Sequence, residues 1–445
     1  MLSGHIVELG KTIWAGADER ALAQRTALVA FMLRAVGAVI AYVAQVVMAR
    51  WMGGFEYGIF IFVWVWVTIL GTVVGLGFNT SILRFFPYYL ERKDLARLRG
   101  FLLASRTLSV AMSTFAALIA AGIVVLLGDR LESYYVLPIV LALICLPLYT
   151  LTDLHDGLAR ANNWVILALA PNYIVRPLLI LIVMAGAIVS GYQPSAVLAV
   201  LASIAGTWVA AIWQFLVVHR RLSPIVPAGD RRIETGDWVK ASLPLVLVEG
   251  LYMMLANTDV LVLSRYHDPD QIAVYFAALK TLSLVQFVAF GVAAAATHRF
   301  SQYHAAGDRE RLAAFARDSV RWTFWPSLAA ALLILALGRP LLSLFGEGFT
   351  AGYGLMFILA VGLVVRAGVG PIEGLLNMLG HQNLCAMVLG ATVVVNLALN
   401  VLLIPWLGLT GAAIATSASI IMEALVLLIF AKRRAGLSMA IWQRS

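Results

Sequence analysis

Charged residues are scarce in this chain. Only 12% of its 445 residues are Asp, Glu, Lys or Arg, whereas about 25% is usual for a soluble globular protein. Hydrophobic residues make up 62%, and the mean hydropathy is +0.91. So little charge excludes a soluble globular domain. We therefore expect an all-α polytopic membrane protein.

Cysteine is nearly absent as well. Cys145 and Cys385 each lie in an apolar stretch without a partner at a metal-binding or disulfide spacing, so both are expected to pack as small hydrophobic residues. No P-loop, HExxH or CxxC pattern occurs, and the glycines at 75 and 77 lack the third glycine of a dinucleotide site. The sequence thus predicts no metal site, no cofactor and no enzyme activity.

One cluster of side chains could suggest a metal site. Asp153, His155 and Asp156 crowd the cytoplasmic end of a predicted membrane span. No further ligand is fixed by the sequence, and we interpret the cluster as a solvated helix end.

What the chain has in abundance is long apolar runs. A helix needs about 20 mostly apolar residues to cross a bilayer. Twelve segments qualify: 26–48, 57–79, 102–127, 135–154, 164–189, 195–218, 238–263, 272–297, 322–345, 352–376, 383–404 and 409–431. Because every loop on the predicted outer side is short, a membrane polysaccharide polymerase or ligase, which tends to carry its catalytic residues on a long outer loop, fits poorly.

Lysine and arginine are distributed unevenly among the predicted loops. With the N-terminus in the cytoplasm, 24 of the 32 lie in inside segments, four in outside loops and four within spans. The positive-inside rule therefore predicts a multi-pass membrane protein with both termini cytoplasmic. This topology, together with anionic lipid headgroups, explains the net charge of +9 without any nucleic acid.

The two halves of the chain repeat a pattern. Arg50-Trp51 and Arg84-Phe85 in the first half match Arg265-Tyr266 and Arg299-Phe300 in the second at a common offset. Six spans repeated in the same orientation predict two parallel six-helix bundles with a central cavity for the substrate. The expected parts are an N-terminal interfacial segment, the first bundle, a cytoplasmic linker, the second bundle and a cytoplasmic tail: 1–25, 26–218, 219–237, 238–431 and 432–445.

Several local motifs resemble those of one transporter family. ARWMGGFEYGIF (49–60) and GLGFNTSILRFFPYYLERKD (75–94) combine a Gly-rich turn, Glu-Tyr-Gly opening the second span, and Arg-Phe with nearby aromatics closing it. NMLGHQN (377–383) adds a motif in the second half. Over residues 25–430 the chain resembles the bacterial oligosaccharide flippase (polysaccharide transporter) family, whose superfamily includes multidrug and toxin extruders.

The resemblance implies a carrier that moves an undecaprenyl-diphosphate-linked oligosaccharide to the periplasmic leaflet by alternating access. It implies no enzyme activity. It would serve export of lipopolysaccharide or exopolysaccharide units, alongside a polymerase and export machinery, with H⁺ or Na⁺ as alternative coupling ions. A cation-coupled multidrug extruder of the same fold is the competing interpretation.

Charges inside predicted spans are the candidate site, because charged side chains in a membrane usually face a bundle interior or a water-filled cavity. Arg34 lies mid-span, and the repeat places Glu249 at the equivalent position of the second half. The two either form a structural pair or hold a diphosphate site, since arginine binds phosphate with a bidentate fork. Gln45 falls on the same predicted helix face as Arg34.

The other intramembrane cations have similar alternatives. Arg366 and Glu373 lie two turns apart on the same face of one predicted helix. They either form a structural pair on that face or line the cavity. Lys280 lies about 13 Å into its span at 1.5 Å per residue, which favours a cavity position, and Arg176 lies in a predicted kink next to a proline. Four cations against three acids favour an anionic substrate.

Two acids near the start of the second half could instead carry a coupling ion. On a helix, Asn257 and Asp259 flank Glu249, so the three line one polar sector. Glu249 would balance Arg34 or carry H⁺ or Na⁺. Asp259 would share that role or be solvated at the periplasmic end.

Overall fold

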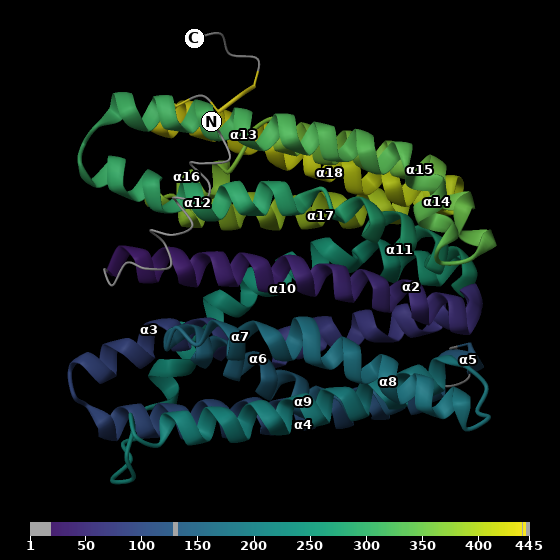
Figure 1. Cartoon of the computed structure of the whole chain (residues 1–445), viewed down its shortest axis with the longest axis horizontal. Coiled ribbons are helices and arrows are strands. Elements are labelled where there is room, and N and C mark those ends of the chain that lie inside the picture. Colours follow the sequence, from purple (N-terminus) through teal and green to yellow (C-terminus); the bar gives the residue numbers. More distant parts are fainter. Residues whose placement is uncertain (1–18, 128–131, 438, 442–445) are drawn as a thin grey trace. The chain divides into compact units, whose positions relative to one another are not determined.

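The computed structural model describes residues 19–127, 132–437 and 439–441. Every regular element in these ranges is a helix (Figure 1). The predicted interfacial segment 1–25 therefore lies mostly outside the described residues.

The chain forms two compact units. Unit 1 comprises residues Met1–Ala44 and Leu70–Leu247, and unit 2 comprises Gln45–Ile69 and Val248–Ser445. The predicted division into bundles 26–218 and 238–431 stays a prediction. It did not anticipate that residues 45–69, from the first half of the sequence, belong with the second unit.

The first two predicted spans lie in α2 (Glu19–Val74), which consists of two helices that meet at a kink at Gly53. Gly53 has φ 75° and ψ 174°, a conformation that other residues rarely adopt. The turn expected after the first span is therefore present at Gly53, as a break of the helix that is shorter than a loop. The apolar stretch Val29–Glu91 runs 63 residues through α2 and α3. At about 1.5 Å per residue it far exceeds a ~30 Å bilayer core, which it must cross twice.

Unit 1 contains both ends of α2, up to Ala44 and from Leu70 onward, together with the helices that follow up to Leu247. Its remaining elements are α3 (Phe78–Glu91), α4 (Leu95–Leu126), α5 (Ser133–Leu143), α6 (Leu146–Ala161), α7 (Val165–Ala170), the π-helical turn η2 (Pro171–Val175), α8 (Arg176–Val189), α9 (Ala196–Leu222) and the start of α10 (Thr235–Tyr266). Helix α6 packs against α3, α4 and α9. The buried rings of Phe78, Phe101 and Trp238 lie in the core, where Trp238 donates a hydrogen bond to the Tyr89 hydroxyl at 3.0 Å.

The predicted cytoplasmic linker is fixed to unit 1. Glu234 forms an ion pair with Arg97 of α4 at 3.0 Å, and Arg99 donates to the carbonyl oxygen of Pro227 at 2.7 Å. Residues 223–234 are thus held against the start of α4 by charge-assisted hydrogen bonds.

Unit 2 contains the rest of α10 and the elements that follow it, along with residues 45–69 of α2. These elements are α11 (Pro269–Ser283), α12 (Gln286–Ala305), α13 (Arg309–Ala336), α14 (Gly338–Ser343), the 3-10 turn η3 (Glu347–Gly352), α15 (Tyr353–Ala367), α16 (Ile372–Met378), α17 (Gln382–Leu407), α18 (Leu409–Phe430) and the π-helical turn η4 (Ala431–Ala435). Helix α18 packs along both α15 and α17 (Figure 1).

The number of membrane crossings follows from helix length and apolar composition. Nine helical stretches in the described residues could each cross a membrane, and two bent pairs raise the number to eleven. Counting both arms of Val29–Glu91 gives the twelve spans that the sequence predicts. The chain is therefore a multi-pass, all-helical membrane protein.

Two predicted spans are bent, and a third was predicted with the wrong ends. The fourth span is bent by 50° between α5 and α6, and the eighth by 42° between α11 and α12. The ninth was predicted at 322–345, but α13 runs from Arg309 to Ala336. Apolar composition misplaced it because the polar residues at its start also belong to the helix.

Two helices begin with the same cap. Asp94 accepts a hydrogen bond from the Arg97 backbone N–H at 3.1 Å before α4, and Asp308 accepts one from the Arg311 N–H at 3.0 Å before α13. The Arg97 N–H, which stabilises the carboxylate, lowers the pKa of Asp94. The two caps lie in the loops that the sequence repeat aligns.

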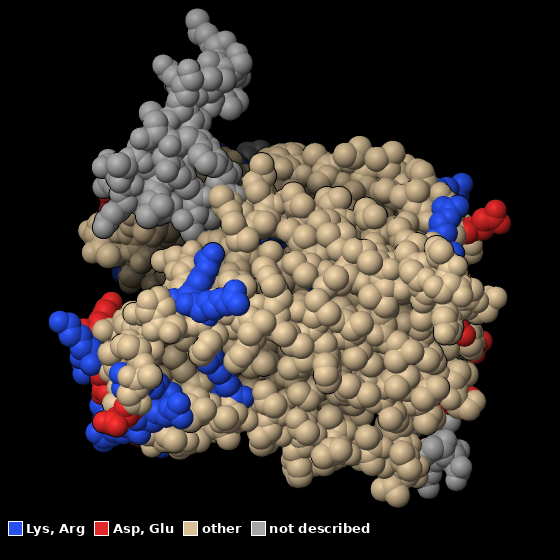
Figure 2. All heavy atoms as spheres, turned by 60° about the horizontal axis from the view of Figure 1, so that its bottom comes forward, with Lys and Arg blue, Asp and Glu red and all other residues tan. Residues whose placement is uncertain are grey.

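Charged side chains are unevenly spread on the surface. On the face drawn in Figure 2, Lys, Arg, Asp and Glu lie in a few separate clusters, and large areas between the clusters are neutral. Large neutral areas are expected on a surface that contacts hydrocarbon.

Candidate functional site

The strongest charge cluster in unit 2 lies at a break between two helices. Helix α15 ends at Ala367 and α16 begins at Ile372, with Gly370 between them at φ 58°. Arg366 spans this break: one guanidinium nitrogen contacts Glu373 at 2.8 Å, and the other donates to the Gly370 carbonyl oxygen at 3.2 Å. The predicted pairing partners are thus together, but the single continuous helix stripe was wrong.

A second carboxyl group joins this pair. Glu423 of α18 is only 7% exposed, and its carboxyl lies near enough to Glu373 and Arg366 to interact with both electrostatically. Tyr252 of α10 donates its hydroxyl to Glu373 at 3.2 Å. Two carboxylates near a single arginine repel each other, so a proton or a monovalent cation bound by the pair would stabilise the cluster.

Glu423 is absent from the residues that the sequence singled out. The signal was available, because it is the lone acid in the apolar run of the last span. Including it makes the count of intramembrane cations and acids even, so that count no longer favours an anionic substrate.

Asp259 is part of a different network in unit 2. It is 3% exposed and accepts hydrogen bonds from the Tyr275 hydroxyl and from the Val260 N–H. The alternative in which Asp259 is solvated at a helix end is therefore wrong. Lys280, on α11 with Tyr275, is exposed and places its ammonium 4.9 Å from the centre of the Phe276 ring.

The other candidates of unit 2 have local partners. Gln45 accepts a hydrogen bond from the Tyr57 hydroxyl at 2.7 Å. Asn257 donates to the Met253 carbonyl oxygen at 2.8 Å within its own helix. Glu249 is half-buried on α10, and its pairing with Arg34 stays a prediction.

Two candidate cations belong to unit 1. Arg34 is half-buried on α2, and its charge acts on the carboxylate of Asp156. Arg176 begins α8 directly after the π-helical turn, which agrees with the predicted kink, and its guanidinium lies 5.3 Å from the centre of the Tyr149 ring. Both positions suit a cation–π or anion contact.

The interpretation of residues 153–156 as a solvated helix end was wrong for His155. This side chain is fully buried, 5.6 Å from Phe215 between ring centres. Asp156 pairs with Arg160 at 3.5 Å. Helix α6 is enclosed by α4 and α9 at this point, which the sequence alone could not show.

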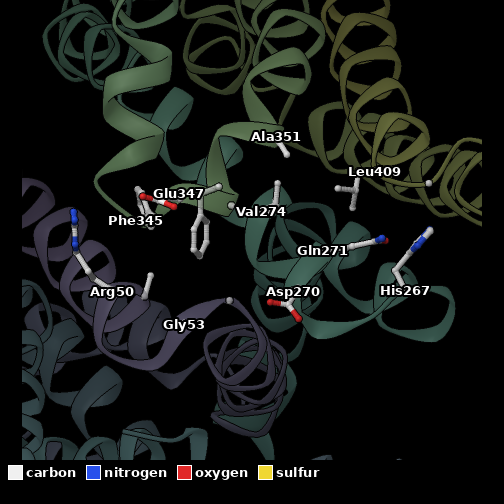
Figure 3. Close-up of a pocket in the computed structure, with 16 residues that line it drawn as sticks. Arg50, Gly53, His267, Asp270, Gln271, Val274, Phe345, Glu347, Ala351 and Leu409 are labelled. Carbon is white, nitrogen blue, oxygen red and sulfur yellow. The ribbon is translucent and has the colours of Figure 1, made fainter.

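Unit 2 also contains a pocket that the sequence did not predict (Figure 3). It has a volume of about 730 Å³. Arg50 and Gly53 of α2, Asp270 and Gln271 of α11, and Glu347 of η3 line it. These segments all fall at the end of unit 2 that the positive-inside rule assigns to the outside.

Comparison with known protein families gives two matches. A model of the family described as polysaccharide biosynthesis protein matches residues 24–304, and a model described as MatE matches residues 244–402. The "Uncharacterized transporter YisQ" of Bacillus subtilis (strain 168) is 24% identical over 207 residues. That match covers 44% of this chain and spans 45% of YisQ, less than half of its length.

Solved structures share the fold. A multidrug resistance MATE family transporter of the MOP superfamily, in an inward-facing conformation, has a TM-score of 0.73 at 15% identity. The match covers 91% of this chain and 98% of the transporter chain. The lipid II flippase MurJ, in an inward closed conformation, has a TM-score of 0.73 at 14% identity, covering 91% and 87%. These likenesses agree with the predicted all-helical polytopic fold.

Proposed function

Because the chain belongs to the polysaccharide biosynthesis protein family, we propose that it is a flippase for a lipid-linked oligosaccharide. The substrate would be an undecaprenyl-diphosphate-linked sugar unit, moved from the cytoplasmic to the periplasmic leaflet of a bacterial inner membrane. The product would serve lipopolysaccharide or exopolysaccharide assembly, in contact with a polymerase and export machinery.

The family match carries this proposal, and the cations at intramembrane positions give it a chemical basis. A diphosphate cannot cross hydrocarbon without its water, and fixed cations can replace that water. Such charges are supplied by four side chains: Arg34, Arg176, Lys280 and Arg366. One guanidinium nitrogen of Arg366 already contacts a carboxylate, that of Glu373. An acid that competes for the arginine allows the phosphate to be released.

Coupling to an ion belongs to the same proposal. The Glu373 and Glu423 carboxyl groups, with Arg366 and Tyr252, form a site that takes up one proton or one monovalent cation. Asp259 and Glu249 are alternative ion sites. Binding and release of the ion would bias the two conformations needed for alternating access.

A cation-coupled multidrug extruder is the second candidate. The MatE match over residues 244–402 favours it, and the buried acids of unit 2 are suited to a cationic substrate. The two functions differ in the substrate charge that the membrane site must balance.

Deletion of the gene in its own bacterium separates these functions. We expect the deletion strain to lose surface polysaccharide and to accumulate lipid-linked sugar units on the cytoplasmic side, measured by radiolabelled sugar incorporation and mass spectrometry. A strain that retains its surface polysaccharide but becomes sensitive to cationic drugs would support the extruder and contradict the flippase.

A further inference from the structure

The pocket of unit 2 has the size and the polar groups of a small-molecule site. Its volume of about 730 Å³ lies within the ~300–1,000 Å³ common for ligand pockets. Figure 3 shows Arg50, Asp270 and Glu347 reaching its walls from three different elements, with Gln271 and His267 on a further wall. Side chains from three elements that meet at one cavity can surround a ligand.

The charges of the pocket disfavour an anion. Asp270 and Glu347 are exposed, and neither has an ion-pair partner among the described residues. Arg50 already donates to the carbonyl oxygen of Leu344 at 3.2 Å. Two carboxylates beside one arginine leave a net negative charge, which repels phosphate and favours neutral or cationic groups.

The hydrogen-bonding groups are suited to hydroxyls. Asp270 and Glu347 accept hydrogen bonds, Arg50 donates, and Gln271 does both. A sugar hydroxyl also donates and accepts, so a saccharide can satisfy this mixed set where a purely cationic or apolar ligand cannot.

Glycine is frequent in the lining of the pocket. Gly53, Gly54, Gly346, Gly348 and Gly408 all line it. A Cβ added to Gly54 would collide with the Asp270 carboxylate, whereas one added to Gly348 would meet no atom. Gly54 therefore allows the close approach of α2 to Asp270, and a large side chain at position 348, on the lining of the pocket, has room without disturbing the backbone.

The loop beneath these glycines is firmly packed. Phe345 and Phe349 are 1% and 4% exposed, with ring centres 5.7 Å apart, and Tyr57 packs 6.2 Å from Phe349. The walls that carry Glu347 and Gly348 thus rest on a rigid base, as pre-organised binding requires.

We propose that this pocket is an outer binding site for sugar residues, neutral or amino-substituted, of the transported glycan. The inference rests on the proposed flippase function, and it assigns the sugar part of the substrate to the outer end of unit 2. The diphosphate is excluded from the pocket by its charge.

The test uses the purified full-length protein and the phosphate-free repeat-unit oligosaccharide released from the bacterium's own surface polysaccharide. Binding is measured by calorimetry. Gly348→Trp fills the pocket, and Gly354→Trp, whose side chain also enters open space but outside the pocket, is the matched control. We expect wild type and Gly354→Trp to bind equally, and Gly348→Trp to bind about tenfold more weakly or less.

A second variant, Asp270→Asn with Glu347→Gln, keeps the shape and removes the negative charge. It should bind inorganic diphosphate better than wild type does. Equal glycan binding by Gly348→Trp and wild type, or no binding by wild type, would overturn the proposal. Flipping of the lipid-linked substrate is measured separately: flipping without glycan binding refutes only this pocket, whereas glycan binding without flipping refutes the proposed function.

Discussion

Arg366→Ala is expected to abolish glycan export while the protein remains in the membrane. The substitution removes the guanidinium that contacts Glu373 at 2.8 Å and would bind a substrate phosphate. It also leaves the Glu373 and Glu423 carboxyl groups without their cation. Export is measured as surface polysaccharide, and membrane content by immunoblotting of the membrane fraction.

A double variant separates a structural role of this pair from a substrate role. If Arg366 only neutralises Glu373, then Arg366→Ala with Glu373→Ala should restore export, because the remaining acid, Glu423, can stay neutral by holding a proton and no unpaired charge remains. If Arg366 binds phosphate, the double variant should stay inactive. Arg366→Lys should be partly active, because it keeps the charge and loses the bidentate fork.

Arg34→Ala, in unit 1, should also abolish glycan export while the protein remains in the membrane. Arg34→Lys should again be partly defective. Normal export by both alanine variants, Arg34→Ala and Arg366→Ala, would contradict the proposal that these cations hold the diphosphate.

Glu423→Gln is expected to uncouple transport from the ion gradient. The amide keeps the size of the side chain and mimics a permanently protonated carboxyl group, so the side chain can stay near Glu373 without a dissociable proton. In proteoliposomes, exchange of substrate without a gradient should continue, whereas acceleration by an imposed gradient should be lost.

The control for this variant is Glu310→Gln, an exposed carboxylate in the first turn of α13. It should respond to the gradient as wild type does. A full gradient response in Glu423→Gln would show that Glu423 is not the coupling residue, and Asp259 and Glu249 would then be the remaining candidates. A response to Na⁺ alone would show that the carboxyl pair holds a metal cation in place of the proton.

The sequence predicted those parts of the fold that depend on local composition. Apolar runs and the distribution of arginine predicted the spans, because a membrane helix must be apolar over its whole length. The Gly-rich turn predicted after the first span is where two helices meet at Gly53, because glycine can adopt a positive φ that other residues rarely adopt. That residues 45–69 belong with unit 2 depends on packing between distant segments, which no local pattern encodes.

The candidate site was predicted in part for the same reason. Arg366 and Glu373 were singled out because charge is costly in a membrane, and they do pair. Glu423 and Tyr252 lie far from them in sequence and reach the pair only through the packing of α10 and α18. The pocket of unit 2 was invisible because its lining comes from α2, α11, η3 and the start of α18.

The central claim, that the substrate is a lipid-linked oligosaccharide, is tested most directly by reconstituting the wild-type protein in liposomes that contain a fluorescent polyprenyl-diphosphate oligosaccharide. Access of an externally added lectin or hydrolase to the sugar measures its movement between leaflets. We expect wild type to accelerate this movement strongly over protein-free liposomes, and Arg366→Ala to match the protein-free rate. Movement at the protein-free rate with wild type, together with transport of a cationic dye by the same liposomes, would contradict the flippase and identify an extruder.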